Sequence, residues 1–265
     1  MRAVQGERMR FDAAAAGQNA RAKNENAPQR RWWSGHVADA AAMFVAAGVL
    51  IAVMIPAVAH VRYDYRRTLC AANLSEVKTA MDRYASIWHG ELPTLGVSAD
   101  GNWLHPAEAR AGGVEEGHTN TANLLPLILA SYITPNRLIC PGRDLPAGTA
   151  ISYTASDIPD SDYSYVNLFG RFRATWDGKD STIVLADRNP LFCGEAGANA
   201  EMNSRNHEGH GNYVVRGDGH VTWEVSPDIG PGRDNIWTVN DGTQRLLTYT
   251  GTETAGSPGD VFLAP

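Results

Sequence analysis

Three histidines and one aspartate lie close together in the segment NHEGHGNYVVRGDGHVTWEV, which covers residues 206–225. They are His207, His210, Asp218 and His220. Imidazole nitrogens and carboxylate oxygens are common ligands of zinc and other divalent ions, so these residues are candidates for a metal site. However, the spacing lacks the fixed helical register that makes a motif such as HExxH diagnostic, and polar residues beside turns are common. A zinc-type site and a simple turn are therefore both open.

Other acidic residues are also candidate ligands for a zinc or calcium ion. Asp187 could join the histidines, or it could bind calcium with Asp218 and Asp234, because calcium prefers loop carboxylates. A metal-dependent hydrolase that uses His207, His210 and Asp218 is a further alternative. The sequence contains no GxSxG elbow, phosphate-binding loop or HExxH helix. We therefore expect no catalytic residues and no cofactor, with a calcium or zinc ion as the alternative.

An Asp-Gly pair, Asp218 and Gly219, divides the segment in two. Such a pair is typical of a two-residue hairpin turn, which requires positive φ angles at both positions. The stretches on both sides carry the β-branched and aromatic residues of strands. A two-residue loop would place Val214 opposite Trp223. The residues then predicted to share the buried face are Val214, Val221, Trp223 and Val225.

A long apolar segment lies near the N-terminus. Residues 40–59 form an uncharged run of 20 residues, about the length that crosses a bilayer. The basic residues and tryptophans of QRRWW just before it favour a cytoplasmic N-terminus. A cleaved secretory signal is the alternative, because the small residues Ala57 and Ala59 follow Pro56. We predict a single-pass protein of the cell inner membrane whose C-terminal domain is periplasmic.

The helix is expected to continue beyond the membrane. No Gly or Pro occurs between His60 and Trp88, and apolar residues recur there at three- and four-residue steps. These residues are Leu74, Val77, Ala80, Met81 and Tyr84. Strand-like segments follow only later in the chain, which is the order of an α+β fold. The predicted parts are a polar leader at 1–34, a transmembrane helix at 35–61, a helical stalk at 62–88 and an extracytoplasmic α+β domain at 89–265.

Charge is unevenly distributed along the chain. Residues 1–34 carry seven Lys and Arg residues against three acidic ones, which leaves 16 basic and 26 acidic residues, a balance of −10, in the rest. A nucleic-acid-binding protein needs a basic face that displaces counterions from phosphates. The acidic balance of residues 35–265 therefore argues against nucleic acid as a partner.

Several motifs follow one another from the apolar segment to the C-terminal region. After Pro56 come RRTLCAANL around Cys70, NLLPLILASYITPNRLICPG, YSYVN, VLADRNP, the hairpin NSRNHEGHGNYVVRGDGHVTW and RDNIWT. Together, from about Asp39 to Thr238, they resemble type II secretion pseudopilin-like proteins, which are similar to type IV pilins. The resemblance implies a pilin-like α+β fold in which a long N-terminal transmembrane helix packs on an antiparallel C-terminal sheet. It also implies a non-catalytic structural subunit of a type II secretion or type IV pilus-like assembly, with a purely structural hairpin.

The N-terminus departs from the pilin-like pattern. Precursors in that family have a Gly before the cleavage site, a Phe directly after it, and a Glu at the position seventeen residues before the Pro, which here is Asp39. The Gly and Phe positions hold Ser34 and Gly35, so the carboxylate is kept but the cleavage motif is degenerate. In the family the acid meets the N-terminal amine of a neighbouring subunit. For Asp39 the alternative is a solvated position at the headgroup boundary.

The resemblance implies three kinds of partner: the lipid bilayer, other pilin-like subunits that pack against the N-terminal helix, and prepilin peptidase. Small residues permit close approach of helices in a membrane. The apolar run supplies Ala40, Ala41, Ala42, Ala46, Ala47 and Gly48. The alternative function is an uncleaved, membrane-anchored module that binds a ligand or a metal through residues 207–220 and does not assemble.

The three cysteines are Cys70, Cys140 and Cys193, and none forms a CxxC pair. They cannot build a zinc ribbon or a thioredoxin-like motif. Cys70 lies in the predicted stalk, and Cys140 follows a short apolar segment that we expect to be helical. We predict a Cys70–Cys140 disulfide that ties the β domain to the stalk, with Cys193 unpaired.

Overall fold

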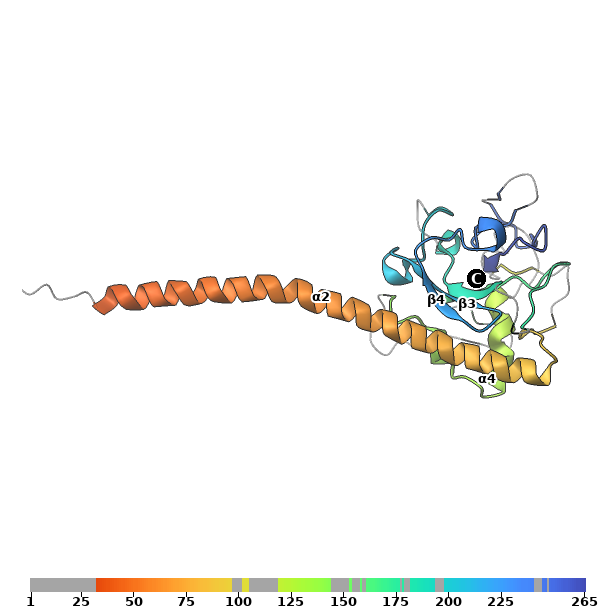
Figure 1. The fold of residues 1–265 in the computed structure, drawn as a ribbon, viewed down its shortest axis with the longest axis horizontal. Coiled ribbons are helices and arrows are strands. Elements are labelled where there is room, and N and C mark those ends of the chain that lie inside the picture. The colour runs from red at the N-terminus through yellow and green to blue at the C-terminus, as the bar shows by residue number, and fades with distance from the viewer. Residues whose placement is uncertain are drawn as a thin grey trace, which may run out of the picture. The chain divides into compact units, whose positions relative to one another are not determined.

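The structure is a computed structural model, and it describes residues 32–96, 102–104, 119–143, 153, 158, 161–176, 178, 182–193, 198–240, 245–246 and 248–265. The chain divides into two units, Met1–Ala59 and His60–Pro265. One helix, α2 (Trp32–Ile87), contributes residues to both units. Figure 1 shows this helix and the elements of the second unit.

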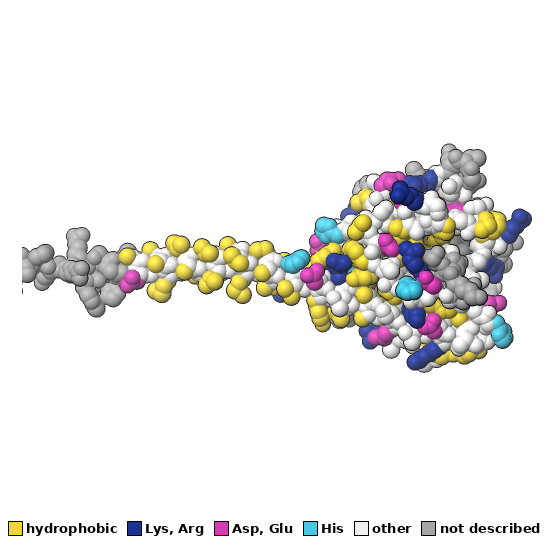
Figure 2. Space-filling model, viewed as in Figure 1, with side chains coloured by type: hydrophobic (Ala, Val, Ile, Leu, Met, Phe, Trp, Pro, Cys, Tyr) yellow, Lys and Arg dark blue, Asp and Glu magenta, His cyan; other side chains and the backbone are white. Residues whose placement is uncertain are grey.

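The first part of α2 is apolar and exposed. Its large hydrophobic side chains between residues 43 and 58 are 43% to 79% exposed, and Figure 2 shows this surface. Among the described residues, α2 is the one helix that is long and apolar enough to cross a membrane. Pro56 lies inside it, which membrane helices tolerate because nearby groups satisfy the freed carbonyl. This surface is compatible with a single-pass membrane protein.

From His60 onward α2 has a buried face. The residues with almost no exposure recur at the predicted three- and four-residue steps, and they are Cys70, Leu74, Val77, Ala80, Met81 and Tyr84. The predicted face is therefore confirmed. Each fully buried Leu or Met side chain stabilises the folded state by about 1.5–3 kcal/mol. This face holds the second part of α2 against the rest of the second unit.

The described residues of the second unit form a five-stranded sheet in the order β4-β3-β2-β1-β5, with every neighbouring pair antiparallel. The strands are β1 (Tyr163–Val166), β2 (Ile183–Asp187), β3 (Asn212–Arg216), β4 (Val221–Glu224) and β5 (Leu263–Ala264). All residues of β1 and β2 are buried. The combination of helices and an antiparallel sheet confirms the α+β class.

Short helices complete the second unit. They are η1 (Asn120–Leu124), α4 (Leu125–Leu129), η2 (Pro135–Leu138), η3 (Pro190–Phe192), η4 (Arg205–His207) and η5 (Pro231–Arg233). Pro126 lies in the first turn of α4. The side chain of Asn123, in η1, accepts a hydrogen bond from the N–H of Leu95 at 3.1 Å. The main core joins α2, η1, α4 and the sheet, and a second cluster surrounds Trp103 and Phe262.

The β3–β4 hairpin differs from its predicted register by one residue. Val214 pairs with Thr222 rather than with Trp223, so the loop contains three residues instead of two. Asp218 and Gly219 both lie in the turn, but only Gly219 has a positive φ, +84°. This is the pattern of a type I turn followed by a left-handed glycine. The prediction of a shared buried face was therefore wrong for Val214, Val221, Trp223 and Val225.

Candidate functional site

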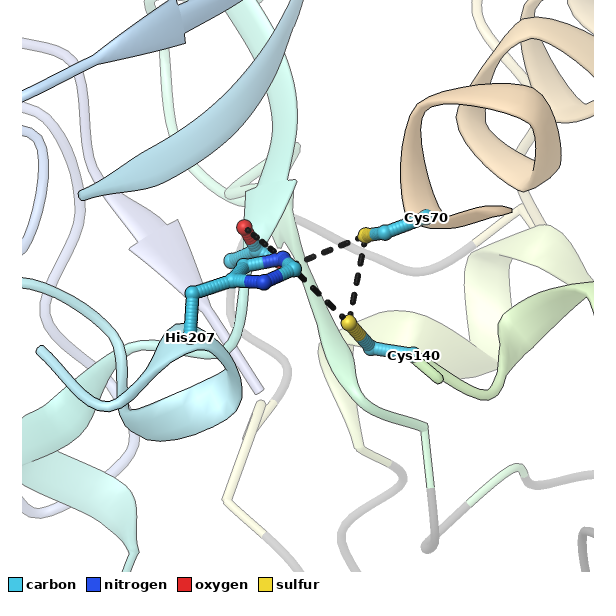
Figure 3. Close-up of side chains that lie close together, drawn as sticks. Cys70, Cys140 and His207 are labelled. Carbon is cyan, nitrogen blue, oxygen red and sulfur yellow. Dashed lines mark hydrogen bonds and ion pairs between the residues drawn. The ribbon is translucent and has the colours of Figure 1, made fainter. Parts of the chain in front are cut away.

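Four side chains of types that bind metal ions meet inside the second unit: Cys70, Cys140, Asp187 and His207. Each offers one ligand atom, and these atoms all lie within 4.8 Å of one another. All four residues are at most 1% exposed. Figure 3 shows the three labelled side chains, from Cys70, Cys140 and His207, pointing toward one another. In the part of the chain that the structure describes, no other group of three or more such side chains is this close.

A different element places each of the four residues. Cys70 belongs to the buried face of α2, and Asp187 is the last residue of the buried strand β2. Cys140 follows η2, and its backbone N–H donates a hydrogen bond to the carboxylate of Asp162 at 3.0 Å. His207 is the last residue of η4. The four-residue cluster therefore forms only when the helix, the sheet and two loops pack together.

The ligand atoms form a closed ring of short distances. Cys70 Sγ lies 3.1 Å from Cys140 Sγ and 3.5 Å from Asp187 Oδ1. His207 Nε2 lies 3.5 Å from Cys140 Sγ and 3.4 Å from Asp187 Oδ2. Each side chain thus has two of the other three as direct neighbours.

Hydrogen bonds from the surrounding chain orient the Asp187 carboxylate. Asn206 Nδ2 donates to Oδ1 at 2.9 Å, and the backbone N–H of Tyr213 donates to Oδ2 at 2.7 Å. The thiol of Cys70 lies 3.3 Å from the hydroxyl oxygen of Tyr163. A carboxylate has about four lone-pair sites, so these donors leave room for a further bond to the carboxylate.

Aromatic rings and a glycine surround the imidazole of His207. Its ring centroid lies 5.7 Å from that of Tyr213 and 5.3 Å from that of Trp223, both edge-to-face. The guanidinium of Arg67, on α2, lies 3.9 Å from the centroid of Trp223. A Cβ at Gly142 would lie 2.6 Å from His207 Nδ1 and 2.2 Å from a backbone oxygen of η4. Only glycine therefore fits at position 142 without a shift of η4.

Burial and neighbouring charges shift the pKa values of the cluster. Burial acts to lower the pKa of His207, but hydrogen bonds and charges from Asp187 and Cys140 outweigh it and raise the pKa to about 9. Burial raises the pKa of the Cys70 thiol well above its usual value, and the Cys140 and Asp187 neighbours add to this shift. Burial also acts to raise the pKa of Cys140, yet hydrogen bonds to Cys70 and His207 prevail and lower it. The pKa shifts of Cys140 and His207 therefore run in opposite directions, downward for the thiol and upward for the imidazole.

The structure separates the four residues of the metal site considered for residues 206–225. His207 belongs to the buried cluster, but the side chain of His210 is 67% exposed and packs edge-to-face on Tyr63. The side chain of His220 is 75% exposed, and its Nδ1 lies 3.0 Å from Asp218 Oδ1. The backbone N–H of His220 also bonds to this carboxylate, which lowers the pKa of Asp218. Within the described residues, these four side chains do not form one metal or hydrolase centre.

The carboxylates of the calcium alternative are also dispersed among different surroundings. Asp187 lies beside two sulfurs in the buried cluster, and Asp218 lies in the hairpin turn. The carboxylate of Asp234 accepts a hydrogen bond from the N–H of Val261 at 2.8 Å, and burial raises its pKa to about 6. Within the described residues, these three carboxylates do not come together as a site.

The cysteines behave in part as expected. Cys70 and Cys140 are adjacent, with both thiols free and 3.1 Å between the sulfurs, whereas a disulfide has a bond of about 2.05 Å. Their covalent bond stays a prediction. Cys193 lies outside this pair, and its Sγ lies 3.6 Å from the backbone oxygen of Asn189.

The residues of the predicted assembly region all fall in α2. Asp39 is exposed, and Pro56 lies within the helix. Ser34 and Gly35 belong to the first turns of α2, but the side-chain surroundings of residues 32–37 lie outside the described part. Their roles in cleavage and assembly stay predictions.

Sequence reasoning named all four residues of the buried cluster but did not join them. It assigned the two cysteines to a disulfide, and it weighed Asp187 and His207 in a site of loop residues. A signal was present, because four of the quoted motifs each contain one member: RRTLCAANL, the segment ending in LICPG, VLADRNP and the hairpin. Comparison of the chain with protein-family models, curated proteins and solved structures gives no match.

Proposed function

We propose that this protein is a non-catalytic, single-pass membrane subunit of a pilin-like assembly of the type II secretion or type IV pilus kind. The observation that carries the proposal is the division of α2. Its first part has an exposed apolar surface, and its second part has a buried face in the core of an α+β unit. In such an assembly, the first part contacts lipid and neighbouring helices, while the second part carries the folded unit.

The composition of the first part of α2 supports packing between helices. Gly48 has no atom within 4 Å of the position that a Cβ would occupy, and alanines precede it at 46 and 47. Without a hydrophobic driving force between helices in lipid, close approach at such small residues is a main source of association. The surface around Gly48 is therefore the proposed contact with other pilin-like subunits.

The proposed orientation rests on the basic residues that precede the apolar run. The basic residues before it favour a cytoplasmic N-terminus and place the sheet-bearing unit in the periplasm. Asp39 then lies near the cytoplasmic boundary, where it would meet a partner group of a neighbouring subunit. Prepilin peptidase is the proposed processing enzyme at Ser34 and Gly35.

A structural role is also supported by the burial of the clustered reactive side chains. The two cysteines, Asp187 and His207 are at most 1% exposed, so a substrate has no direct access to them. The exposed histidines, His210 and His220, each lie beside a single carboxylate. Neither arrangement supplies a nucleophile next to an oriented base in an accessible site.

Photo-crosslinking in native membranes tests the assembly. A photoreactive residue replaces Val49, which is 59% exposed in α2, and a control replaces Val225, which is 72% exposed on the second unit. We expect the probe at Val49 to give covalent dimers and larger adducts that contain the apolar helix of a second subunit, and the probe at Val225 to give few. A probe at Val49 that yields only monomers and lipid adducts would support the uncleaved, anchored binding module instead.

A further inference from the structure

We propose that Cys70, Cys140, Asp187 and His207 hold one zinc ion in a closed, four-ligand structural site. The donor set is two sulfurs, one imidazole nitrogen and one carboxylate oxygen. The ion would link the second part of α2 to the loop after η2, the end of β2 and the end of η4. This proposal is independent of the assembly proposal, since it concerns only the interior of the second unit.

The distances between the donor atoms fit a tetrahedral ion. With bonds of about 2.3 Å to sulfur and about 2.0–2.2 Å to nitrogen or oxygen, tetrahedral angles place neighbouring donors roughly 3.3–3.8 Å apart. Of the six pairs in a tetrahedral site, three have distances of 3.4, 3.5 and 3.5 Å, where Asp187 contributes Oδ2 toward His207 and Oδ1 toward Cys70. All four ligand atoms lie within 4.8 Å of one another, so the remaining pairs need to approach by at most about 1.5 Å. The distance between the sulfurs, 3.1 Å, needs to widen by about 0.7 Å to match two bound thiolates. The side chains therefore need small rotations and no change of fold.

Burial gives the second argument for an ion. Asp187 is 0% and His207 is 1% exposed, and both cysteines are at most 1% exposed. A carboxylate or thiolate in such surroundings is costly unless it is paired or coordinates a metal. The hydrogen bonds from Asn206 and Tyr213 fix the carboxylate, which is how outer groups usually orient a metal ligand. A zinc ion between these side chains would compensate the negative charges of the buried carboxylate and thiolates.

The histidine can offer the correct nitrogen. Nε2 of His207 faces Cys140 and Asp187, and Nδ1 is buried without a hydrogen-bond partner among the described residues. Zinc binds a neutral imidazole, so Nε2 would bind the ion and Nδ1 would carry the proton. Gly142 leaves space for the ring in this position, because a Cβ there would lie 2.6 Å from Nδ1.

The donor types select the ion. Calcium and magnesium take oxygen ligands, whereas thiolate and imidazole ligands in a tetrahedral arrangement favour zinc. Four protein ligands leave no open position for water or substrate, which is typical of structural zinc sites. Of the two ions considered from the sequence, zinc therefore fits this cluster and calcium does not.

A disulfide between Cys70 and Cys140 would remove two of the four ligands. Zinc binding and the predicted disulfide are therefore mutually exclusive states of one protein molecule. The zinc-bound state requires both cysteines as thiolates and His207 as a neutral imidazole, so metal binding would release protons from these ligands. The experiment consequently uses the reduced protein.

Cobalt(II) titration of the full chain in detergent, kept reduced with a phosphine, tests the site. Cobalt replaces zinc in tetrahedral sites and reports thiolate and tetrahedral coordination by its absorption. We expect one cobalt per chain, intense visible d–d bands and a near-ultraviolet thiolate-to-cobalt band. Added zinc should remove these bands, because zinc binds more tightly than cobalt in the divalent series.

Matched variants assign the ligands. Cys70→Ser, Cys140→Ser and His207→Gln should each lose the thiolate-type tetrahedral spectrum or reduce the affinity at least tenfold. Cys193→Ser and His210→Gln are controls of the same residue types outside the cluster, and they should keep the spectrum of the wild type. Far-ultraviolet circular dichroism checks that each variant is folded.

Two measurements on the wild type do not depend on the variants folding. Zinc at 100 times its dissociation constant should raise the unfolding midpoint of the reduced protein by roughly 5–10 °C. In a urea concentration that partly unfolds the reduced protein without zinc, zinc should also slow the alkylation of Cys70 and Cys140, but not of Cys193. Folded, reduced protein without a tetrahedral cobalt spectrum, without a midpoint shift and without this protection would overturn the zinc site. So would a Cys70→Ser variant that binds cobalt like the wild type.

Discussion

The two parts of α2 share one secondary structure but differ in surroundings. Residues 43–58 carry large apolar side chains that are 43% to 79% exposed. In the later part of the helix, a buried face of at most 7% exposure is formed by Cys70, Leu74, Val77, Ala80, Met81 and Tyr84. The first part of the helix therefore has a surface suited to lipid, and the second part has a face suited to a protein core. This difference shows that the hydrophobic pattern on the helix surface, rather than the helical structure itself, determines whether the helix contacts lipid or a protein core.

The largest effect should come from shortening a leucine in the buried part. Leu74→Ala removes a side chain with 0% exposure and leaves a cavity, so we expect a loss of about 2–5 kcal/mol in the free energy of unfolding. Leu50→Ala, the matched change at 63% exposure, should stay within about 0.5 kcal/mol. Urea unfolding of the second unit, followed by tryptophan fluorescence in detergent, measures both. Equal losses for the two variants would remove the distinction between the two parts.

Adding one methyl group beside the four-residue cluster should cause a smaller loss in the free energy of unfolding. In Gly142→Ala the new Cβ would lie 2.2 Å from a backbone oxygen of η4 and 2.6 Å from Nδ1 of His207. The resulting shift of η4 should cost about 1–3 kcal/mol and weaken cobalt binding. Gly48→Ala is the control, because that position has no atom within 4 Å, and the second unit should unfold as in the wild type. An unchanged unfolding midpoint for Gly142→Ala would show that η4 is not held against this glycine.

The buried face of α2 could be predicted because it depends on a local period. Leu74, Val77 and Met81 repeat at helical steps, and nothing distant in the chain is needed to assign them to one side. The hairpin was harder, since an Asp-Gly pair fits both a two-residue and a three-residue loop. The observed loop places Gly219 alone at positive φ, and this one-residue difference changes every cross-strand partner.

The four-residue cluster could not be assembled from spacing. Cys70 and Asp187 are 117 residues apart and Cys140 and His207 are 67 apart, so their meeting depends on the packing of α2 against β2 and η4. Strand β5 is a related case, because two residues carry no period and their pairing with β1 depends on the rest of the sheet. Local sequence patterns therefore predict secondary-structure elements such as α2, whereas the four-residue cluster is recognised only in the tertiary structure.

The central claim is that the exposed apolar part of α2 belongs to the mature protein and anchors it. Intact mass and N-terminal peptide sequencing of the protein extracted from native membranes test this claim directly. We predict a chain that retains residues 38–59, with a start near Ser34 and Gly35 if prepilin peptidase accepts the degenerate motif. A mature chain that begins after Ala59 would instead identify the apolar run as a cleaved signal and would contradict both the anchor and the assembly.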